Sequence, residues 1–520
     1  MIENMFSLVS DPLLTVRKES GTITQVSLPA VLSLLAKDDI VSFEALQTHQ
    51  KQAWHCFLVQ LAAIALSHAG RNEIPTETSD WNHLLLALTS EEENPWCLVV
   101  EDVSKPAFMQ SPVPEGSLDE ANYKTSADTP DSLDVLVTAK NHDVKMHRIS
   151  HPKPEHWIYS LVTLQTMEGY LGKGNYGIVR MNGGFASRPL VGITPALEWP
   201  IRFNEDLNVL LGARPHLIED YGYQASGLAL LWLQPWDGTK DACIPLADCD
   251  PLFIEICRRV RFIWDKEEIH CLSGNTNAAR IALPDDFKGV TGDPWTPVRK
   301  KDEKALTVGR NGFSYELIKE VLLTGEYASP VCMSLSHNKN QASFLVATVL
   351  VRGQGKTEGF HHRVVPVPPK AMSLLASPTQ REKLGTRSED RVTKANDVAN
   401  RVLRPTLYVL ISGKTGSLSA KQRSNLAAAA QRWLRAFDRS VDDVFFEDLW
   451  ESLNCEQQVA DKTWQGRLRD FASREFVNAK RSCAHPSIAK YRVLSAAESI
   501  FNAGIRRELP ALFDENDKED

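Results

Sequence analysis

The sequence predicts an α+β fold in which a large mixed N-terminal domain is followed by a C-terminal four-helix bundle. Over the first 369 of the 520 residues, short runs of β-branched and apolar residues alternate with helical segments, as in mixed domains. After Pro366, Pro368 and Pro369 the chain changes to long segments in which apolar residues recur at spacings of three and four, the pattern of packed helices. We therefore expect an α+β domain over residues 1–369 and a helical bundle over residues 370–520.

The N-terminal residues predict a β-meander followed by two buried helices. Strands are expected around Phe6–Val9 and Leu13–Val16, on either side of a break at Pro12, with a third strand after the next Ser-Gly turn. Apolar spacings of three and four predict a helix that begins at Ser27 and helical structure over residues 43–68. We expect these helices to cover the sheet.

The middle of the chain predicts mixed structure around a glycine-rich stretch. Residues 111–131 are rich in Pro, Ser, Asp and Glu without periodicity, so a loop is expected there. A helix is expected over residues 157–167, before the stretch LGKGNYGIVRMNGGFASRP, whose glycines exclude a continuous helix or strand. Residues 225–365 combine β-rich runs with helical pieces, one of which is expected around residues 251–264.

The C-terminal part predicts amphipathic helices. Its long segments are rich in Ala, Leu and Arg, and their apolar residues fall on one helical face. Such segments pack as a bundle of about four members. The helices are expected near residues 388–412, 418–440, 456–481 and 486–508.

Charge is distributed unevenly between the two predicted domains. Residues 1–369 carry 33 basic and 45 acidic residues, a net charge of −12, whereas residues 370–520 carry 25 basic and 21 acidic residues, a net charge of +4. The whole chain is at −8, which argues against a protein that coats nucleic acid by bulk electrostatic attraction. The positive helical part is consistent with a surface that faces phosphates or an acidic partner, and equally with ordinary solvated helix faces.

Composition and motifs disfavour several classes of protein. No window approaches 18 uninterrupted apolar residues and the N-terminus lacks the features of a signal peptide, so a cytoplasmic location is expected. The nine cysteines are scattered without a C-x-x-C pair, which disfavours a disulfide framework or a zinc ribbon. No G-x-S-x-G or H-E-x-x-H motif occurs. We therefore expect no catalytic activity, no metal site and no cofactor.

The first candidate site is the motif Gly172-x-Gly174-x-x-Gly177-x-Val179, which has the spelling of a protein-kinase glycine loop. A kinase needs a lysine on the next strand, but none occurs between Lys173 and Lys240. A dinucleotide fold needs a strand before the loop, where a helix is predicted. A nucleotide-binding enzyme remains an alternative. Glycines also permit close backbone approach to duplex DNA, with Lys173 and Asn175 alongside, and a purely structural turn is the competing interpretation.

Two further polar segments are candidate contacts. Residues His337–Ser343 are rich in amides and lie between β-like runs, so they could form either an ordinary turn or a wedge inserted at a base step. Arg299-Lys300-Lys301 follows a turn-rich segment, and its simplest interpretation is an exposed basic loop.

Several segments, taken in this order, resemble the CasA family, the large subunits of type I-E CRISPR Cascade complexes. The resemblance covers nearly the whole chain, and the ordered set is more specific than any one segment. The matching segments are Phe6–Val9, Pro12–Val16, Lys105-Pro-Ala-Phe-Met-Gln110, Gln165 with the glycine loop after it, Met181–Pro189, Trp232–Gly238, Arg258–Phe262 and Asn340-Gln341-Ala342-Ser343.

The resemblance implies that the chain reads double-stranded DNA. In this family the large subunit checks the protospacer-adjacent motif, largely from the minor groove, and then promotes strand separation and R-loop formation. The minor groove offers a degenerate code, so backbone groups and one cation give a permissive check, and guide pairing supplies the sequence. Carried onto this chain, the glycine loop falls on Gly172, Lys173, Gly174 and Asn175, the lysine finger on Lys300 or Lys301, and the wedge on Asn340 and Gln341.

The resemblance also implies partners. These are the crRNA-bearing Cascade subunits (backbone, handle-binding and small subunits), double-stranded target DNA, and a separate helicase-nuclease recruited after the R-loop forms, with no membrane. An assembly scaffold that does not contact DNA is the second alternative. The loop over residues 137–145 stands where family members dock onto the guide and neighbouring subunits, and the docking residues implied are Lys140, Asn141, His142 and Lys145.

Overall fold

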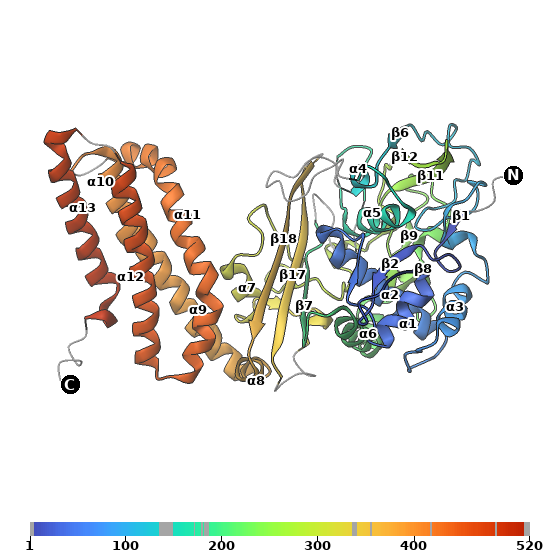
Figure 1. The fold of residues 1–520 in the computed structure, drawn as a ribbon, viewed down its shortest axis with the longest axis horizontal. Helices are drawn as coiled ribbons and strands as arrows, with labels where there is room; N and C mark the ends of the chain where they lie inside the picture. The colour runs from blue at the N-terminus through green and yellow to red at the C-terminus, as the bar shows by residue number, and fades with distance from the viewer. Residues whose placement is uncertain are drawn as a thin grey trace. The chain divides into compact units, whose positions relative to one another are not determined.

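The chain packs into two compact units, which are described separately. The first unit comprises Met1–Phe313 and Glu326–Pro366, and the second comprises Ser314–Gly325 and Val367–Asp520. The second unit thus includes a segment from within the range 1–369. The predicted α+β class with a helical C-terminal region is confirmed (Figure 1). The computed structural model describes residues 5–134, 149–170, 172–177, 180, 187–334, 341–353, 356–416, 419–483 and 486–513.

The first unit contains several small sheets, each with two or three strands among the described residues. Sheets of this size need helices and loops against them to be stable. Hydrogen-bonded neighbours, in sheet order, are β1 (Met5–Ser7) with β5 (Cys97–Val99); β3 (Ile23–Val26), β2 (Leu14–Arg17) and β4 (Ser42–Phe43); β11 (Arg259–Asp265), β12 (Glu268–Gly274) and β6 (Thr125–Ala127); β10 (Cys249–Ile254) with β8 (Leu228–Leu230); β13 (Ile281–Ala282) with β9 (Ile244–Pro245); β15 (Lys304–Ala305), β14 (Val298–Arg299) and β16 (Tyr327–Ala328); and β18 (Lys356–Val367), β17 (Ser343–Gly353) and β7 (Leu190–Thr194).

The three strands predicted at the N-terminus are confirmed, but they do not form a meander. β2 pairs antiparallel with β3 and with β4, whereas β1 pairs with β5. The chain turns after β1, where the N–H of Asp11 donates to the Ser7 carbonyl. The N–H of Leu8 donates to the carbonyl of Trp96, which precedes β5. Since the turn and the break at Pro12 separate β1 from β2, the first strand is free to join a distant one.

Helix α2 lies at the centre of the core of the first unit. Every residue from Gln52 to Leu66 is buried, as in a helix that is covered on all sides. α2 packs against α5, α6 and β10. The helices of this unit are α1 (Leu28–Ala36), α2 (Lys51–His68), α3 (Thr78–Ala87), α4 (Pro130–Asp134), α5 (Pro154–Met167) and α6 (Trp199–Tyr221).

Two segments predicted to be helical are partly or largely extended. The helix expected over residues 43–68 starts only at Lys51, because Ser42–Phe43 pairs with β2. Residues 251–264 form most of β10 and β11. β10 is buried at all six positions, so its apolar run does not alternate, and periodicity alone cannot distinguish such a strand from a buried helix. The expected loop at 111–131 also contains β6 and the start of α4.

His55 is buried in α2 beside a carboxylate of α6. Its Nε2 lies 2.8 Å from Oδ2 of Asp206. Burial lowers the pKa of His55, and the charge of Arg202 acts in the same direction. In the unfolded chain the histidine has an ordinary pKa of about 6.5. Acidification therefore protonates the unfolded state before the folded state.

We expect the free energy of unfolding of the first unit to fall as the pH drops below about 6.5, and His55→Gln to weaken this dependence. The sign follows because the unfolded state binds a proton that the folded state excludes. Urea midpoints measured at about pH 7.5 and 5.5 test this. His83→Gln, at an exposed position of α3, is the control, and an equal pH dependence in both variants would contradict the assignment to His55.

The sheet of β18, β17 and β7 contains the two longest strands in the described part of the first unit, with 12 residues in β18 and 11 in β17. β17 pairs antiparallel with β7 from Phe344 opposite Thr194 to Thr348 opposite Leu190. Even-numbered side chains of β17 and β18, such as Thr348 and His362, face the beginnings of α2 and α6. One face of this sheet therefore meets the N-terminal ends of two helices.

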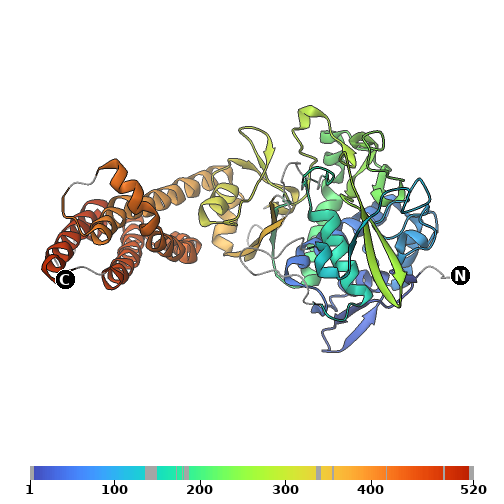
Figure 2. The same ribbon diagram turned by 90° about the horizontal axis from the view of Figure 1, so that it is seen from above.

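The second unit is a bundle of long helices, as predicted. Helices α9, α11 and α12 pack against one another, and α13 packs against α10 and the segment before it (Figures 1 and 2). α9 continues into α10 through a π-helical segment, Val398–Leu403. No helix in the described part of either unit is both long and apolar enough to span a membrane. The helices of the bundle are α7 (Tyr315–Leu322), α8 (Pro369–Leu375), α9 (Pro378–Asp397), α10 (Arg404–Ser412), α11 (Ala420–Glu451), α12 (Gln457–Ser482) and α13 (Ser487–Glu508).

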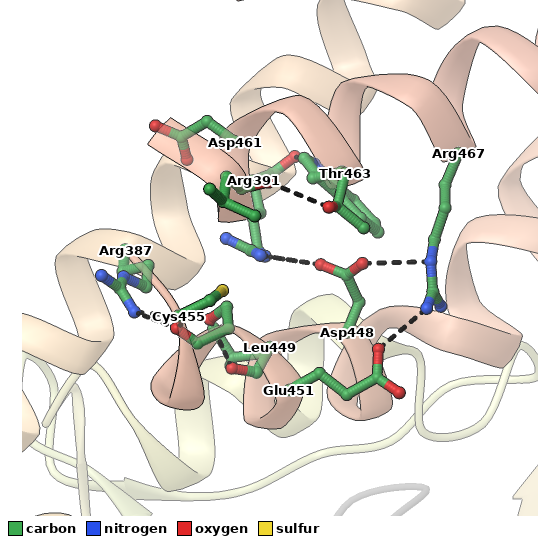
Figure 3. Close-up of polar contacts among 12 residues, drawn as sticks. Arg387, Arg391, Asp448, Leu449, Glu451, Cys455, Asp461, Thr463 and Arg467 are labelled. Carbon is green, nitrogen blue, oxygen red and sulfur yellow. Dashed lines mark hydrogen bonds and ion pairs between the residues drawn. The ribbon is translucent and has the colours of Figure 1, made fainter. Parts of the chain in front are cut away.

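A buried ion-pair network joins α9, α11 and α12 (Figure 3). Asp448 of α11 accepts a hydrogen bond of 2.7 Å from Nη2 of Arg391 of α9, and its Oδ2 lies 3.2 Å from Nε of Arg467 of α12. Arg391 and Asp448 are buried, whereas Arg467 is partly exposed and reaches Glu451 at the surface. The indole N–H of Trp464 donates to the Arg391 carbonyl, and the guanidinium of Arg391 lies over the Trp464 ring. One carboxylate thus links three helices.

Helix α7 belongs to this bundle although it precedes β16, β17 and β18 in the sequence. The N–H of Tyr315 donates to Oδ1 of Asp442 on α11 over 2.6 Å, and the Tyr315 ring lies 4.8 Å from that of Phe445. Lys319 forms an ion pair with Glu389 of α9. The contacts of α7 are therefore those of a bundle helix.

Candidate nucleic-acid interface

The glycine loop, residues 172–177, is preceded by a buried glutamine in the last turn of α5. Oε1 of Gln165 accepts hydrogen bonds from the backbone N–H groups of Cys257 (2.9 Å) and Arg258 (2.8 Å). Its Nε2 donates to the carbonyls of Met109 (2.9 Å) and Arg258 (3.0 Å). These four bonds use both the oxygen and the NH2 of the side-chain amide. Gln165 therefore joins α5, the start of β11 and the segment around Met109.

The glycine loop is a tight turn laid against the segment that follows β12. The N–H of Asn175 donates to the Gly172 carbonyl (3.0 Å), and the N–H of Thr276 donates to the Gly174 carbonyl (2.8 Å). Gly174 has a φ of +81°, a conformation that glycine adopts without steric cost. Backbone hydrogen bonds thus fix the turn and leave its side chains available for other contacts.

Gly177 ends the loop where the backbone passes very close to the two residues before β11. A Cβ at this position would lie 2.8 Å from the Cys257 carbonyl oxygen and would overlap the side chain of Arg258. Arg258 is held by Glu168 over 3.2 Å, and the same buried carboxylate lies 2.8 Å from Nη2 of Arg352. The loop therefore rests on a floor of paired buried charges.

The loop exposes three side chains of different chemistry. Lys173, Asn175 and Tyr176 are exposed, and the ring of Tyr176 lies 4.9 Å from that of Tyr170. Lys173 supplies a cation, Asn175 an amide donor and acceptor, and Tyr176 an aromatic face. Such a set suits contacts to the backbone and base edges of a nucleic acid.

The surroundings of the loop differ from those of a nucleotide-binding loop. Helix α5 precedes it, whereas the dinucleotide motif follows a strand and opens a helix whose amides hold the phosphates. The N–H groups of Asn175 and Tyr176 donate within the protein, to Gly172 and Thr276. These two amides are therefore already engaged, which disfavours the nucleotide-binding alternative.

The lysines proposed as a finger lie in the turn between β14 and β15. Arg299 and Asp302 close the turn with two hydrogen bonds of 2.9 and 2.6 Å, and this pairing holds the pKa of Asp302 at about 2. The N–H of Lys300 donates to the Glu326 carbonyl over 2.9 Å. Lys300 and Lys301 are both exposed. The turn therefore presents two cations on a backbone fixed from both sides.

Gln341 lies exposed immediately before β17. The hydroxyl of Ser343 lies 3.4 Å from its carbonyl oxygen, and the side chain makes no hydrogen bond to another described residue. Asn340, the other wedge residue, lies outside the described residues. The implied docking residues Lys140, Asn141, His142 and Lys145 lie outside them as well.

Three exposed elements carry the candidate contacts: the glycine loop, Gln341, and the turn between β14 and β15 with Lys300 and Lys301, which we call the lysine turn. Among the described residues no hydrogen bond or ion pair joins one of them to another. Nor does the described part of the chain bring together three or more His, Cys, Asp or Glu side chains that could hold a metal ion.

The residues that support the glycine loop were missed by sequence reasoning. Asn275 and Thr276 carry no motif, and only the folded chain places them beside the loop. A signal did exist for the floor beneath it, because Arg258-Arg259-Val-Arg261 is an unusual run of arginines in an apolar context. All three arginines are buried, and buried arginine is rare without partners. Such a run therefore predicts a buried polar network.

Solved structures share this fold. Cse1 from Acidimicrobium ferrooxidans has a TM-score of 0.65 at 16% sequence identity, covering 98% of this chain and 99% of that one. CasA (Cse1) from Thermus thermophilus has a TM-score of 0.64 at 14% identity, covering 97% and 100%. A chain of a CRISPR RNA-guided surveillance complex has a TM-score of 0.55 at 15% identity, covering 96% and 99%. No protein-family model and no curated protein matches the sequence. Over nearly its whole length, the chain therefore has the fold of the CasA (Cse1) proteins.

Proposed function

We propose that this chain is the large subunit of a type I-E Cascade complex and recognises the protospacer-adjacent motif of double-stranded DNA. The observation that carries the proposal is the glycine loop, which presents Lys173 and Asn175 from a backbone fixed by hydrogen bonds in a chain with the CasA fold. A loop fixed before binding loses little conformational entropy on contact with DNA. The loop is therefore the primary reader.

The chemistry of the loop suits the minor groove. That groove offers acceptors at A·T and T·A pairs and an added donor at G·C pairs, so one cation and one amide distinguish classes of base pair without reading a full sequence. Lys300 or Lys301 adds a second cation against the backbone or groove. The motif check is thus permissive, and guide pairing supplies the remaining specificity.

Gln341 acts in strand separation. It is exposed directly before a long strand, so its polar side chain can enter a base step beside the motif, with Asn340 next to it. Unstacking a step costs a few kcal/mol, which later pairing and backbone contacts offset. R-loop formation then starts next to the motif.

The chain carries out this role within an assembly and without catalysis of its own. Its net charge of −8 does not favour independent DNA binding, since phosphate neutralisation needs basic residues in excess. Cascade subunits and the guide supply the positive surface, with the 137–145 loop docking onto them. A separate helicase-nuclease, recruited to this subunit, cuts the DNA.

The double variant Lys173→Ala with Gln341→Ala is expected to bind target duplex at least about tenfold more weakly in the assembled guide complex, because a lost base or groove contact costs about 1–3 kcal/mol. Binding to a target with a pre-opened bubble beside the motif is expected to stay near wild type, because the strands are already apart. Gel-shift titrations with duplexes that differ only in the flanking motif measure both.

The matched control replaces an exposed lysine and an exposed glutamine elsewhere in the first unit, Lys105→Ala with Gln234→Ala. Wild-type binding of both substrates by the Lys173 and Gln341 variant would point to the scaffold alternative. ATP binding that is lost in Gly174→Val would instead point to the nucleotide-binding alternative.

A further inference from the structure

A pocket of about 270 Å³ lies between the beginnings of α2 and α6 and one face of the β18-β17-β7 sheet. We call it the α2–α6 pocket. Its volume lies just below the usual range of ligand pockets, which begins at about 300 Å³. None of its described lining residues belongs to the glycine loop, to the lysine turn or to the segment at Gln341. It is therefore a separate feature of the first unit.

Three basic side chains from three different elements line the pocket. Lys51 is the first residue of α2, Arg202 lies in the first turn of α6, and His362 lies on β18. Arg202 is half-buried, and its Nη2 donates to Oε1 of Gln52 over 2.8 Å. That bond uses one of the five guanidinium N–H groups. The guanidinium therefore keeps donors for a ligand.

No acidic residue is among the described residues that line the pocket. No described carboxylate forms an ion pair with Lys51 or Arg202, although the charge of Asp206, one turn further along α6, acts on Arg202. This is unusual for a domain whose sequence carries a net charge of −12 over residues 1–369. The N-terminal ends of α2 and α6 both meet the pocket, and the positive ends of the two helix dipoles add to its positive potential. The local electrostatics therefore favour an anion.

The same pocket has an aromatic wall. Trp199, the first residue of α6, is half-buried, and its ring meets that of Phe43 edge to face with the centroids 4.9 Å apart. Phe360 and His362 lie along β18 with rings parallel to within 5° and centroids 6.5 Å apart. Leu197, at the rim, is exposed. The pocket thus combines cations with flat apolar surfaces.

His362 connects the two halves of the pocket. Its Nδ1 lies 2.9 Å from Oγ1 of Thr348 on the neighbouring strand. Burial lowers the pKa of His362, and the charges of Arg202 and Lys51 lower it further. A phosphate between these three groups would oppose the effect of the two cations, because a nearby negative charge favours the imidazolium form.

We propose that the α2–α6 pocket binds one nucleotide of a single-stranded nucleic acid. Its phosphate lies against Lys51, Arg202 and His362, and its base lies against Trp199 or Phe360. This is the combination by which single strands are held, a cationic track for the backbone and aromatic faces for the bases. The inference does not rest on the duplex-reading role proposed above, because it concerns other residues and an unpaired strand.

A nucleotide explains more of the pocket than a peptide carboxylate does. A carboxylate would pair with the cations but would make no use of the aromatic side chains. A nucleotide carries both an anionic phosphate and a planar base, joined by one sugar. The volume suits a group of about the size of one base with its phosphate. Since guide RNA and displaced DNA share this chemistry, the experiment must separate the two sources.

The test is binding of labelled oligouridylate and oligothymidylate to the full-length chain, measured by fluorescence anisotropy over a series of salt concentrations. We expect Lys51→Ala with Arg202→Gln to weaken binding about tenfold and to reduce the salt slope by about one unit, since one phosphate contact is lost. Phe360→Leu keeps apolar bulk and removes the ring, and is expected to weaken binding at least about fivefold. Lys51→Ala alone, at an exposed position, guards against a folding defect.

The control double variant, Lys105→Ala with Arg310→Gln, changes exposed cations elsewhere in the first unit and is expected to bind as wild type does. A second measurement is the pKa of His362, determined by NMR of its imidazole protons. A purely structural role of the pocket would leave this pKa unchanged on addition of an oligonucleotide. The pKa of His362 is expected to rise when either oligonucleotide is added, because a phosphate beside the ring favours the imidazolium form, and to stay unchanged when a polyglutamate peptide is added as a control anion.

Preference for oligouridylate assigns the site to RNA, and preference for oligothymidylate assigns it to displaced DNA; both support the inference. Equal affinity of the Lys51 and Arg202 variant and the wild type for both oligonucleotides, with an unmoved His362, would overturn it. So would binding of uridine monophosphate as tightly as the oligonucleotide, because the site would then serve a free nucleotide. Neither result bears on the duplex-binding experiment, which uses Lys173 and Gln341.

Discussion

Replacing Asp448 with alanine is expected to lower the free energy of unfolding of the helical unit by about 3–5 kcal/mol. Asp448 is buried against Arg391 and also holds Arg467. Its removal leaves the Arg391 guanidinium buried without a counter-charge, and the loss of a partner from a buried pair costs far more than the pair itself contributes. Hydrogen exchange of peptides from α9 and α12, compared with wild type, measures the loss where it occurs.

The same network supplies the control and the rescue. Glu451 bonds to Arg467 at the surface, and Glu451→Gln is expected to cost no more than about 1 kcal/mol because exposed ion pairs contribute little. Replacing both buried partners, Asp448→Leu with Arg391→Met, is expected to recover most of the stability, since an apolar pair needs no counter-charge. A double variant as unstable as Asp448→Ala would show that packing at this position, and not the unpaired charge, sets the cost.

Replacing Gln165 with leucine is expected to lower the free energy of unfolding of the first unit by about 3 kcal/mol or more. Leucine is similar in volume, so the cavity is small, but the N–H groups of Cys257 and Arg258 and the Met109 carbonyl lose a buried partner. Each buried backbone group left unsatisfied costs about 1–3 kcal/mol. Urea unfolding followed by tryptophan fluorescence measures the effect.

Gln234→Leu is the control for this change, because Gln234 is exposed and its side chain makes no hydrogen bond to a described residue. Its expected effect on stability is within about 0.5 kcal/mol. If Gln165→Leu is as stable as Gln234→Leu, then Gln165 is not the clamp that holds the start of β11. A clear loss of stability, by contrast, means that any loss of DNA binding in a Gln165 variant reflects an unanchored glycine loop.

The sequence was most informative where local chemistry decides the structure. The helices of the bundle follow from apolar spacing, and their existence is confirmed even where the bounds shift, as in α11, which runs to Glu451. Residues 251–264 were wrongly predicted as helical because β10 is buried at every position. The pairing of β1 with β5 was beyond prediction for a different reason, since nothing local tells a strand which distant edge it will join.

For the candidate site, the sequence supplied the exposed residues but not what holds them. Lys173 was named from the glycine motif, and Lys300 and Gln341 from the resemblance to the CasA family; all three are exposed in the structure. The supports, such as Thr276 beneath the loop and the Arg299–Asp302 pair in the lysine turn, come from segments without a motif. Cavities pose the same problem, because the α2–α6 pocket draws its side chains from helices α2 and α6 and from strands β17 and β18, which are far apart in the sequence. Only folding brings such residues together.

Helix α7 constrains when the second unit can be completed during synthesis. The segment Ser314–Gly325 leaves the ribosome before β16, β17 and β18, but its partners Asp442 and Phe445 lie on α11. Domains tend to fold in order from the N-terminus. The apolar face of α7 therefore stays without its bundle partners while more than a hundred further residues are synthesised. A fragment that begins at residue 367 would lack this helix, and a fragment that ends at residue 366 would carry it without its partners. No single cut in the gene therefore yields both units complete.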